Sequence, residues 1–191
     1  MEKRKINSDK LVVIGGSSGS LDVLLHLLPG LKGDIDYPIV IVLHRKSSSD
    51  SILSDLLSTR TTLKVKEIEE KEMLTAGVIY IAPGDYHVLF EKDHTFSLDY
   101  SEKINYSRPS IDASFESAAD IFGGALTCIL LSGANADGSE GFRHAKSKNA
   151  TLIAQLPSTA DVPYMPEQAI NNAPVDHIFN VAQMISFLNQ L

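Results

Sequence analysis

A short loop near the start of the chain combines glycines and serines in an order that suits nucleophilic catalysis. The apolar run 11–14 leads directly into residues 15–19, which read G-x-S-x-G around Ser17. This pattern predicts a strand that turns sharply into a helix, with Ser17 at the apex and glycines where a side chain would clash. The amide N–H groups at the start of that helix would face any charge that develops beside Ser17. Ser17 is therefore a candidate nucleophile.

The same loop also suits phosphate binding, because glycine-rich turns between a strand and a helix often cradle phosphate groups. The hydroxyls of Ser17, Ser18 and Ser20 are available for that role. The dinucleotide-binding spacing G-x-G-x-x-G is absent, and no Gly-Lys-Ser or Gly-Lys-Thr follows. The loop by itself leaves both interpretations open.

Two further polar residues follow apolar runs in the same way. His44 comes directly after the run 39–43, and Asp137 lies in the segment that follows the run 127–131. In an open parallel sheet, reactive groups gather at the carboxyl ends of the strands. We therefore expect Ser17, His44 and Asp137 at one sheet edge. Acyl transfer uses these three residue types: an oxygen nucleophile, a base near neutral pH and a carboxylate that orients the base.

Each of these residues also has a purely structural interpretation. His44 could hydrogen-bond a backbone carbonyl, and Asp137 could cap the helix that follows it. The order Ser…His…Asp also differs from the Ser…Asp…His order of α/β-hydrolases, whose nucleophile usually lies far into the chain. A serine hydrolase with this order would belong to another family.

The elements that must position these residues alternate along the chain. Strands are expected at 11–14, 39–43, 64–67, 127–131, 151–154 and 178–180, and helices at about 20–28, 50–58, 111–122, 138–146, 166–172 and 181–190. Segment 78–82 is expected to form an antiparallel hairpin with 87–91, with 95–98 as a third strand. Ser110 is the expected N-cap of the helix that ends at 122.

This alternation predicts an α/β fold with a doubly wound, mostly parallel sheet in a Rossmann-like three-layer arrangement, interrupted by the antiparallel hairpin. The run 127–131 is the most apolar and is expected to be central. We expect one domain over residues 10–191, preceded by a flexible leader at residues 1–9.

Composition excludes several classes of protein. The 191 residues, 43% of them hydrophobic and 21% charged, are typical of one globular domain. No apolar run reaches the ~20 residues of a membrane span, and no signal-type segment follows the N-terminus. The single cysteine, Cys128, fits a buried strand and a cytoplasmic protein. A net charge of −7 without a basic stripe disfavours nucleic acid, and six scattered histidines give no metal-binding pattern.

Five segments together resemble the catalytic domain of the chemotaxis protein-glutamate methylesterase family. They are 14–19, 43–44, 80–87, 108–112 (Arg-Pro-Ser-Ile-Asp) and 131–138, and the pairs Ala154-Gln155 and Met165-Pro166 extend the resemblance toward the C-terminus. It covers residues 11–191. The segments 80–87 and 108–112 are the most diagnostic.

This resemblance implies a nucleophile at Ser17, a base at His44 and an orienting carboxylate at Asp137. It implies hydrolysis of glutamyl γ-methyl esters on cytoplasmic chemoreceptor helices with release of methanol, a related glutamine deamidation, and no cofactor or metal. Family members commonly carry an N-terminal receiver domain, for which this chain has no room. A separate receiver domain or a histidine kinase is then the expected regulatory partner.

The chain departs from the family pattern around the triad. Arg45 and Lys46 follow His44 where the family often has Met-Pro, Ala134 replaces a frequent methionine, and Ser18 replaces a frequent threonine. Backbone amides near Ser18 and Ala134 are the expected oxyanion donors. These departures leave the target ester open.

Basic residues near the expected catalytic edge could bind an acidic substrate. Arg108 is the expected substrate contact and Arg45 the expected source of altered specificity, whereas Lys46 and Arg143 fit solvated surface charges. Two other functions remain open: a nucleotide- or phosphate-binding module, and a non-catalytic protein that docks on receptors or kinases.

Overall fold

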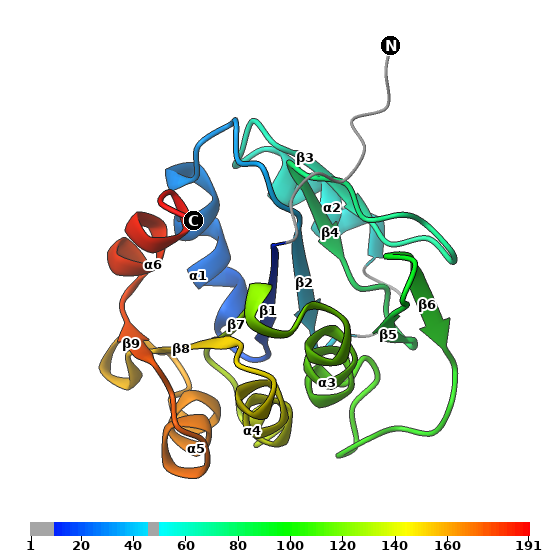
Figure 1. Cartoon of the computed structure of the whole chain (residues 1–191). Helices are drawn as coiled ribbons and strands as arrows, with labels where there is room; N and C mark the ends of the chain where they lie inside the picture. The colour runs from blue at the N-terminus through cyan, green and yellow to red at the C-terminus, as the bar shows by residue number, and fades with distance from the viewer. Residues whose placement is uncertain (1–9, 46–49) are drawn as a thin grey trace.

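Seven parallel strands form the central sheet of the protein. The computed structural model describes residues 10–45 and 50–191 (Figure 1), so the expected leader 1–9 and Lys46 lie outside the described residues. The strand order is β3-β4-β2-β1-β7-β8-β9. These strands are β1 (Leu11–Gly16), β2 (Ile39–Leu43), β3 (Lys64–Glu67), β4 (Val78–Ile81), β7 (Leu126–Leu130), β8 (Thr151–Gln155) and β9 (His177–Phe179).

Helices cover both faces of this sheet (Figure 1). One face packs against α1 (Ser20–Leu27), α2 (Asp50–Ser58) and α6 (Val181–Leu188). The other packs against α3 (Ile111–Phe122), α4 (Ser139–Ser147) and α5 (Tyr164–Asn172). Among the described residues, short 3₁₀ helices complete some of the connections: η1 (Leu28–Gly30), η3 (Gly123–Ala125) and η4 (Pro157–Thr159).

The two hydrophobic cores follow from the two-residue period of the strands. In β1, Leu11 and Val13 point into the core beneath α3, α4 and α5, whereas Val12 and Ile14 point into the core beneath α1, α2 and α6. All four residues are fully buried. A strand buried on both faces is typical of a parallel sheet between two helical layers. The predicted doubly wound three-layer fold is therefore confirmed.

The predicted pairing of segment 78–82 with 87–91 is wrong. The strand β4 is buried along its whole length and pairs in parallel with β2 and β3. The antiparallel hairpin is formed instead by β5 (His87–Phe90) and β6 (Phe96–Asp99), which make a separate two-stranded sheet. An apolar strand such as β4 buries more surface between two helical layers than it could in an exposed hairpin.

Other sequence expectations hold in detail. Ser110 caps α3, because its Oγ accepts a hydrogen bond from the amide of Ala113 at 3.3 Å. The strand β7 lies beside β1, the middle strand of the sheet, and its Cys128 is fully buried. Burial raises the pKa of the Cys128 thiol well above its ordinary value.

The strand order creates a topological switch point between β1 and β7. From β1 the chain moves to β2 on one side, whereas β7, β8 and β9 follow one another on the other side. Loops that leave β1 and β7 therefore diverge and leave a crevice at the carboxyl ends of these strands. The segments that carry Ser17, His44 and Asp137 all begin at this edge.

The turn between β1 and α1 depends on glycine at position 19. Its φ of 82° is in the left-handed region, and a Cβ there would lie 2.7 Å from Asp161 Cβ and Ser132 Oγ. We expect Gly19→Ala to lower the free energy of unfolding by about 1–3 kcal/mol through backbone strain and steric overlap. Urea denaturation followed by circular dichroism measures this loss.

The matched control is Gly124→Ala, because a Cβ at Gly124 would meet its nearest neighbour at an ordinary 3.6 Å. Equal stability changes in the two variants would contradict the structural role assigned to Gly19.

Candidate active site

The turn after β1 holds Ser17 at the mouth of a cleft. The amide of Ser17 donates to Ser132 O at 2.9 Å, and Ser20 Oγ donates to Ser17 O at 2.5 Å. A Cβ at Gly16 would lie 2.6 Å from Ser20 Cβ, so only glycine allows the helix to start this close to the strand. The cleft, of about 270 Å³, is lined by both Ser17 and His44.

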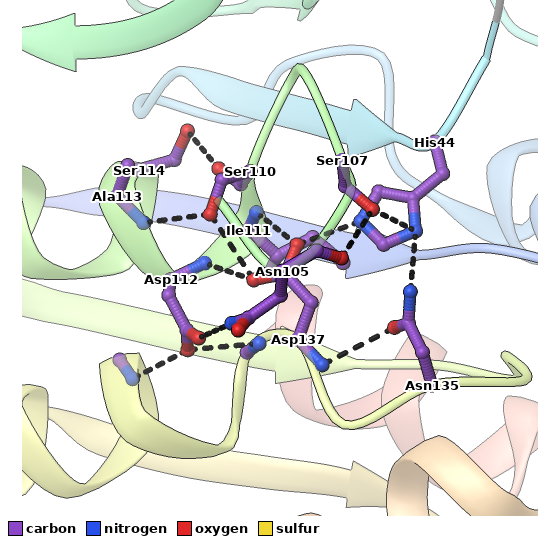
Figure 2. A network of polar contacts seen from close by, with 12 residues as sticks. His44, Asn105, Ser107, Ser110, Ile111, Asp112, Ala113, Ser114, Asn135 and Asp137 are labelled. Carbon is purple, nitrogen blue, oxygen red and sulfur yellow. Dashed lines mark hydrogen bonds and ion pairs between the residues drawn. The ribbon is translucent and has the colours of Figure 1, made fainter. Parts of the chain in front are cut away.

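His44 and Asp137 are joined by a short hydrogen bond. His44 Nε2 lies 2.7 Å from Asp137 Oδ2 (Figure 2). The carboxylate is completely buried, whereas the imidazole retains 12% of its side-chain exposure. The structure therefore brings these two predicted residues together from loops 93 positions apart. Within residues 10–45 and 50–191, Ser17 Oγ makes no hydrogen bond to the imidazole.

The carboxylate of Asp137 lies at the N-terminus of α3 and not at that of its own helix. Its Oδ2 accepts the amide of Ile111 at 2.7 Å, and its Oδ1 accepts the amide of Asp112 at 3.0 Å and the hydroxyl of Ser110 at 3.1 Å. The alternative that Asp137 simply caps the helix after it does not hold, because Gly138 is the N-cap of α4 without any side-chain bond.

These contacts keep Asp137 ionised. Burial alone would raise the pKa of Asp137, but the hydrogen bonds from His44 and from the amides of Asp112 and Ile111 outweigh burial and lower it. A charged carboxylate beside Nε2 favours the imidazole tautomer that carries its proton on Nε2, and it stabilises the imidazolium.

A second buried carboxylate, that of Asp112, mirrors this arrangement. Its Oδ1 accepts the amides of Gly138 at 2.8 Å and Gly141 at 2.7 Å, at the start of α4. Its Oδ2 accepts Asn105 Nδ2 at 3.2 Å. Thus the aspartate at the start of α3 binds α4, and the aspartate before α4 binds α3. This exchange ties the two helices together beside His44.

Asp112 differs from Asp137 in its protonation. Burial is the largest cause that raises the pKa of Asp112, to about 7; the amide of Gly141 opposes this effect, and the negative charge of Asp137 adds to it. No imidazole balances Asp112 as His44 balances Asp137. The negative charge is therefore held mainly by Asp137, the carboxylate that contacts His44.

The second imidazole nitrogen of His44 has only weak partners. Ser107 Oγ and Asn135 Nδ2 each lie 3.5 Å from Nδ1, at the limit of a hydrogen bond. Both groups can donate, which agrees with a lone pair on Nδ1 and a proton on Nε2. Because Asp137 occupies Nε2, Nδ1 is the nitrogen left to exchange a proton with a nucleophile.

Another histidine, His87, binds the N-cap residue of α3. Its Nδ1 accepts the amide of Ser110 at 3.0 Å, and its Nε2 lies 2.9 Å from Glu102 O. A carbonyl only accepts, so Nε2 donates and the ring is neutral. This buried ring fixes Ser110, which in turn binds Asp137.

The backbone amides expected to bind an oxyanion have no partner in the part of the chain that the structure describes. These amides belong to Ser18 and Ala134, and both residues are exposed. Ser132 connects their two loops, since its Oγ donates to Ser18 O at 2.7 Å and its carbonyl accepts the amide of Ser17. The amides of Ser18 and Ala134 are thus available on the two loops that Ser132 connects.

Arg45 lies at the cleft, but its guanidinium bonds within the protein. Nε and Nη2 donate to Ala82 O at 3.2 and 2.7 Å, and Nη2 also donates to Glu67 Oε2 at 3.0 Å. Only 7% of the Arg45 side chain is exposed. Arg45 thus ties the end of β2 to the ends of β3 and β4.

Arg108 also has internal partners. Its Nη1 donates to the carbonyls of Tyr100 and Ser101 at 3.3 and 2.7 Å, and its guanidinium lies 3.9 Å above the Tyr100 ring. These hydrogen-bond partners are neutral, and Arg108 brings its positive charge to a second cavity, which also borders His44. Arg143 is paired with Glu140 on the surface of α4, as expected of a solvated charge.

The described residues hold no group of three or more His, Cys, Asp or Glu side chains placed to bind a metal ion. Over the same residues, every helix is too short or too polar to cross a bilayer.

Sequence reasoning placed Ser17, His44 and Asp137 at one edge but missed the groups that hold Asp137. Ser110 was expected only as an N-cap, and Asp112 and His87 only as members of matching segments. Their roles depend on α3 and α4 approaching each other, which no local pattern encodes. The sequence signal that could have found them is the presence of polar residues within segments 80–87 and 108–112, the most diagnostic parts of the resemblance.

The pKa of Asp112 makes a testable contribution to stability. The folded-state value of about 7 lies above the ~3.9 of an unfolded aspartate, so the folded protein holds a proton that the unfolded chain has lost. This contribution is complete below about pH 4 and is lost as the pH rises to about 7. In Asp112→Asn the Oδ1 acceptor remains but the titration is removed.

We expect the unfolding free energy of the wild type, relative to Asp112→Asn, to decrease between pH 5 and pH 7 and to level off by pH 8. Urea denaturation at each pH gives this difference, with the exposed Asp34→Asn as the surface control. A difference that stays constant from pH 5 to pH 8 would show that Asp112 is ionised throughout.

Known proteins share this fold and sequence. Residues 12–188 match the CheB methylesterase family. A protein of Leptospira interrogans that carries the name protein-glutamate methylesterase/protein-glutamine glutaminase is 38% identical over 180 residues, or 94% of this chain and 93% of that protein. A protein of the same name from Maricaulis maris is 35% identical over 92% of this chain but 44% of its own length.

Among solved structures, the crystal structure of the Thermotoga maritima CheB methylesterase catalytic domain superposes with a TM-score of 0.92. It is 33% identical and covers 95% of this chain and 97% of that domain. A family match across nearly the whole chain, joined with this degree of structural similarity, settles the classification. The chain belongs to the CheB methylesterase family.

Proposed function

We propose that this protein hydrolyses glutamyl γ-methyl esters in proteins, releasing methanol, and that it also converts particular glutamines to glutamates. The observation that carries this proposal is the ionised Asp137 bonded to His44 beside the cleft of Ser17, in a chain of the CheB methylesterase family. Relatives named protein-glutamate methylesterase/protein-glutamine glutaminase support both activities.

The proposed mechanism begins with attack of Ser17 Oγ on the ester carbonyl carbon, while His44 Nδ1 takes the hydroxyl proton. The resulting imidazolium is stabilised by Asp137, which holds Nε2 at 2.7 Å. The oxyanion accepts hydrogen bonds from the free amides of Ser18 and Ala134. Collapse of the tetrahedral intermediate expels methoxide, which takes the proton from Nδ1 and leaves as methanol.

Deacylation repeats these steps with water. Nδ1 accepts a proton from water as the oxygen attacks the acyl carbon, and then returns that proton to Ser17 Oγ, freeing the glutamate carboxylate. A glutamine side chain would follow the same route, with ammonia as the leaving group. In both cases the weak contacts of Nδ1 at 3.5 Å leave that nitrogen free for proton transfer.

Arg45 and Arg108 are proposed to act on the substrate in different ways. Glu67 neutralises part of the charge of Arg45, so Arg45 shapes the cleft through its bonds to Ala82 O. Arg108 hydrogen-bonds to two carbonyls and stacks on the Tyr100 ring, and it makes no ion pair with any other described residue. We therefore assign to Arg108 the attraction of an acidic substrate, such as a methylated cytoplasmic helix of a chemoreceptor.

Regulation is proposed to come from a partner in the cytoplasm, either a separate receiver domain or a histidine kinase. The competing functions have less support. A phosphate- or nucleotide-binding module would need neither His44 nor Asp137, and a protein that only docks on receptors would not need an ionised carboxylate aligned with an imidazole.

We expect Ser17→Ala to lower methanol release from a methylated receptor fragment by at least about 10⁴-fold, because the nucleophile is lost. Circular dichroism and urea denaturation should show an unchanged fold. The matched control is Ser186→Ala on the exposed side of α6, which should keep full activity.

A serine-directed phosphonate should label the wild type but not Ser17→Ala, since only an activated serine reacts. Methanol release that survives in Ser17→Ala would refute the assignment. Saturable micromolar binding of mononucleotides at the Ser17 loop, without ester hydrolysis, would support the phosphate-binding alternative.

We expect Arg108→Ala to raise KM for a methylated receptor fragment by about 10-fold while changing kcat/KM for a small uncharged methyl ester less than 2-fold, since about 1.4 kcal/mol of electrostatic attraction corresponds to a factor of 10. Arg108→Lys, which keeps the charge but loses the paired carbonyl bonds, is the matched variant. Equal losses on both substrates would instead assign Arg108 to support of the loop at residues 100–101.

A further inference from the structure

Two cavities of about 270 Å³ each meet at His44. His44 and Arg45 line both of them, so the imidazole stands between the two. We call them the apolar cavity and the basic cavity. Apart from these two shared residues, the apolar cavity is lined by Ser17, Ser20, Leu21, Leu43, Ile52, Leu53 and Leu56, and the basic cavity by Asp85, Lys103, Tyr106, Ser107 and Arg108.

The apolar cavity carries hydrophobic side chains that remain open to solvent. Ile52 on α2 is 69% exposed and Leu21 on α1 is 37% exposed. Burial of such side chains against an apolar partner removes hydrocarbon surface from water and is favourable by roughly 25 cal/mol per Å². This side of His44 is therefore suited to an apolar side chain.

The basic cavity has the opposite character. Lys103 and Arg108 contribute two positive charges against the single negative charge of Asp85, in a chain whose net charge is −7, whereas Arg45 is paired with Glu67. Lys103 is exposed and makes no ion pair with any other described residue. A local reversal of sign in an acidic protein attracts an anionic group.

Tyr106 stands at the rim of the basic cavity on a strained turn. Backbone hydrogen bonds of 3.1 and 2.9 Å between Ile104 and Ser107 close this turn, with φ of 49° at Asn105 and 63° at Tyr106. A left-handed backbone costs a non-glycine residue about 1–2 kcal/mol, yet the Tyr106 side chain is 97% exposed. The strained backbone of this turn therefore does not serve to bury the Tyr106 ring within the described protein.

The turn is attached to the active site at both ends. Asn105 Nδ2 donates to Asp112 Oδ2 at 3.2 Å, and Ser107 Oγ lies 3.5 Å from His44 Nδ1 (Figure 2). These contacts with Asp112 and His44 fix the backbone turn that carries Tyr106. An aromatic side chain on such a turn offers a large contact surface at a low entropy cost, because it has only two side-chain torsions to order.

We propose that the two cavities bind the two neighbours of the ester-bearing residue: an apolar side chain on the Ser17 side of His44 and a carboxylate on the Lys103 side, with Tyr106 packed against the substrate chain. This inference rests on the proposed function and specifies its substrate. In an α-helix, residues at i−4, i and i+4 share one face, so one helical face presents all three groups together.

The test uses helical peptides with one glutamyl γ-methyl ester at position i. The reference peptide has Leu and Glu at i−4 and i+4, prepared in both orders; a second peptide has Gln in place of Glu, and a third has Ser in place of Leu. For the wild type, we expect kcat/KM for the better order of the reference peptide to exceed that of each altered peptide at least 5-fold.

Variants assign each preference to its cavity. Lys103→Ala should abolish discrimination between Glu and Gln, whereas Lys92→Ala, an exposed lysine that lines neither cavity, should retain it. Ile52→Asp should abolish discrimination between Leu and Ser, with Met73→Asp as the exposed control outside both cavities. Tyr106→Asn keeps a residue that tolerates a left-handed backbone but removes the ring, and should raise KM for all three peptides at least 3-fold with kcat unchanged.

A small uncharged methyl ester separates this inference from the proposed function. The two control variants, Lys92→Ala and Met73→Asp, should hydrolyse it at the wild-type rate, and Ser17→Ala should not hydrolyse it. If the wild type hydrolyses this ester but uses the three peptides equally, or if Lys103→Ala and Lys92→Ala behave alike, the two-cavity inference is overturned. If the wild type cannot hydrolyse any of these esters, the proposed function itself fails.

Discussion

The rest of the site depends on a buried negative charge at the start of α3. Burying an unpaired carboxylate costs several kcal/mol, so it persists only with well-placed donors. Asp137 has four: His44 Nε2, the Ser110 hydroxyl, and the amides of Ile111 and Asp112. Three of these belong to the first turn of one helix, where the helix dipole also favours negative charge. The carboxylate that orients the base is thus held by the packing of α3 against the sheet.

The site depends on the neighbouring helix α4 as well. Asp112 returns the contact by accepting the amides of Gly138 and Gly141 at the start of α4. Separating the two helices would therefore leave two buried carboxyl groups without their hydrogen-bond donors. This would cost far more free energy of folding than the loss of one surface ion pair. His44, the proposed base, comes from the opposite side of the switch point, at the end of β2. The orientation of the His44 imidazole therefore depends on how α3 and α4 are placed relative to the sheet.

The sequence predicted the parts of the site that a single strand determines. Each of Ser17, His44 and Asp137 follows an apolar run, and the rule that strand ends meet at one edge was sufficient to group them. It failed for β4, because an apolar segment followed by Pro83 and Gly84 resembles a hairpin arm as well as a buried parallel strand. It also missed the role of Asp112, which is set by contact between two helices and therefore has no local signature.

Arg45 and Arg108 each combine a structural role with an electrostatic one. Arg45 fastens the ends of three strands, and Arg108 fastens the backbone at Tyr100 and Ser101 while stacking on the Tyr100 ring. A planar guanidinium can satisfy several carbonyls in fixed directions, which a lysine ammonium cannot do. Glu67 offsets the charge of Arg45, whereas Arg108 brings a positive charge to the cavity beside His44, in a protein that is acidic as a whole. The exposed Lys103 adds a further positive charge to the same cavity. An anionic group that enters this cavity therefore meets positive charge that is in position before it binds.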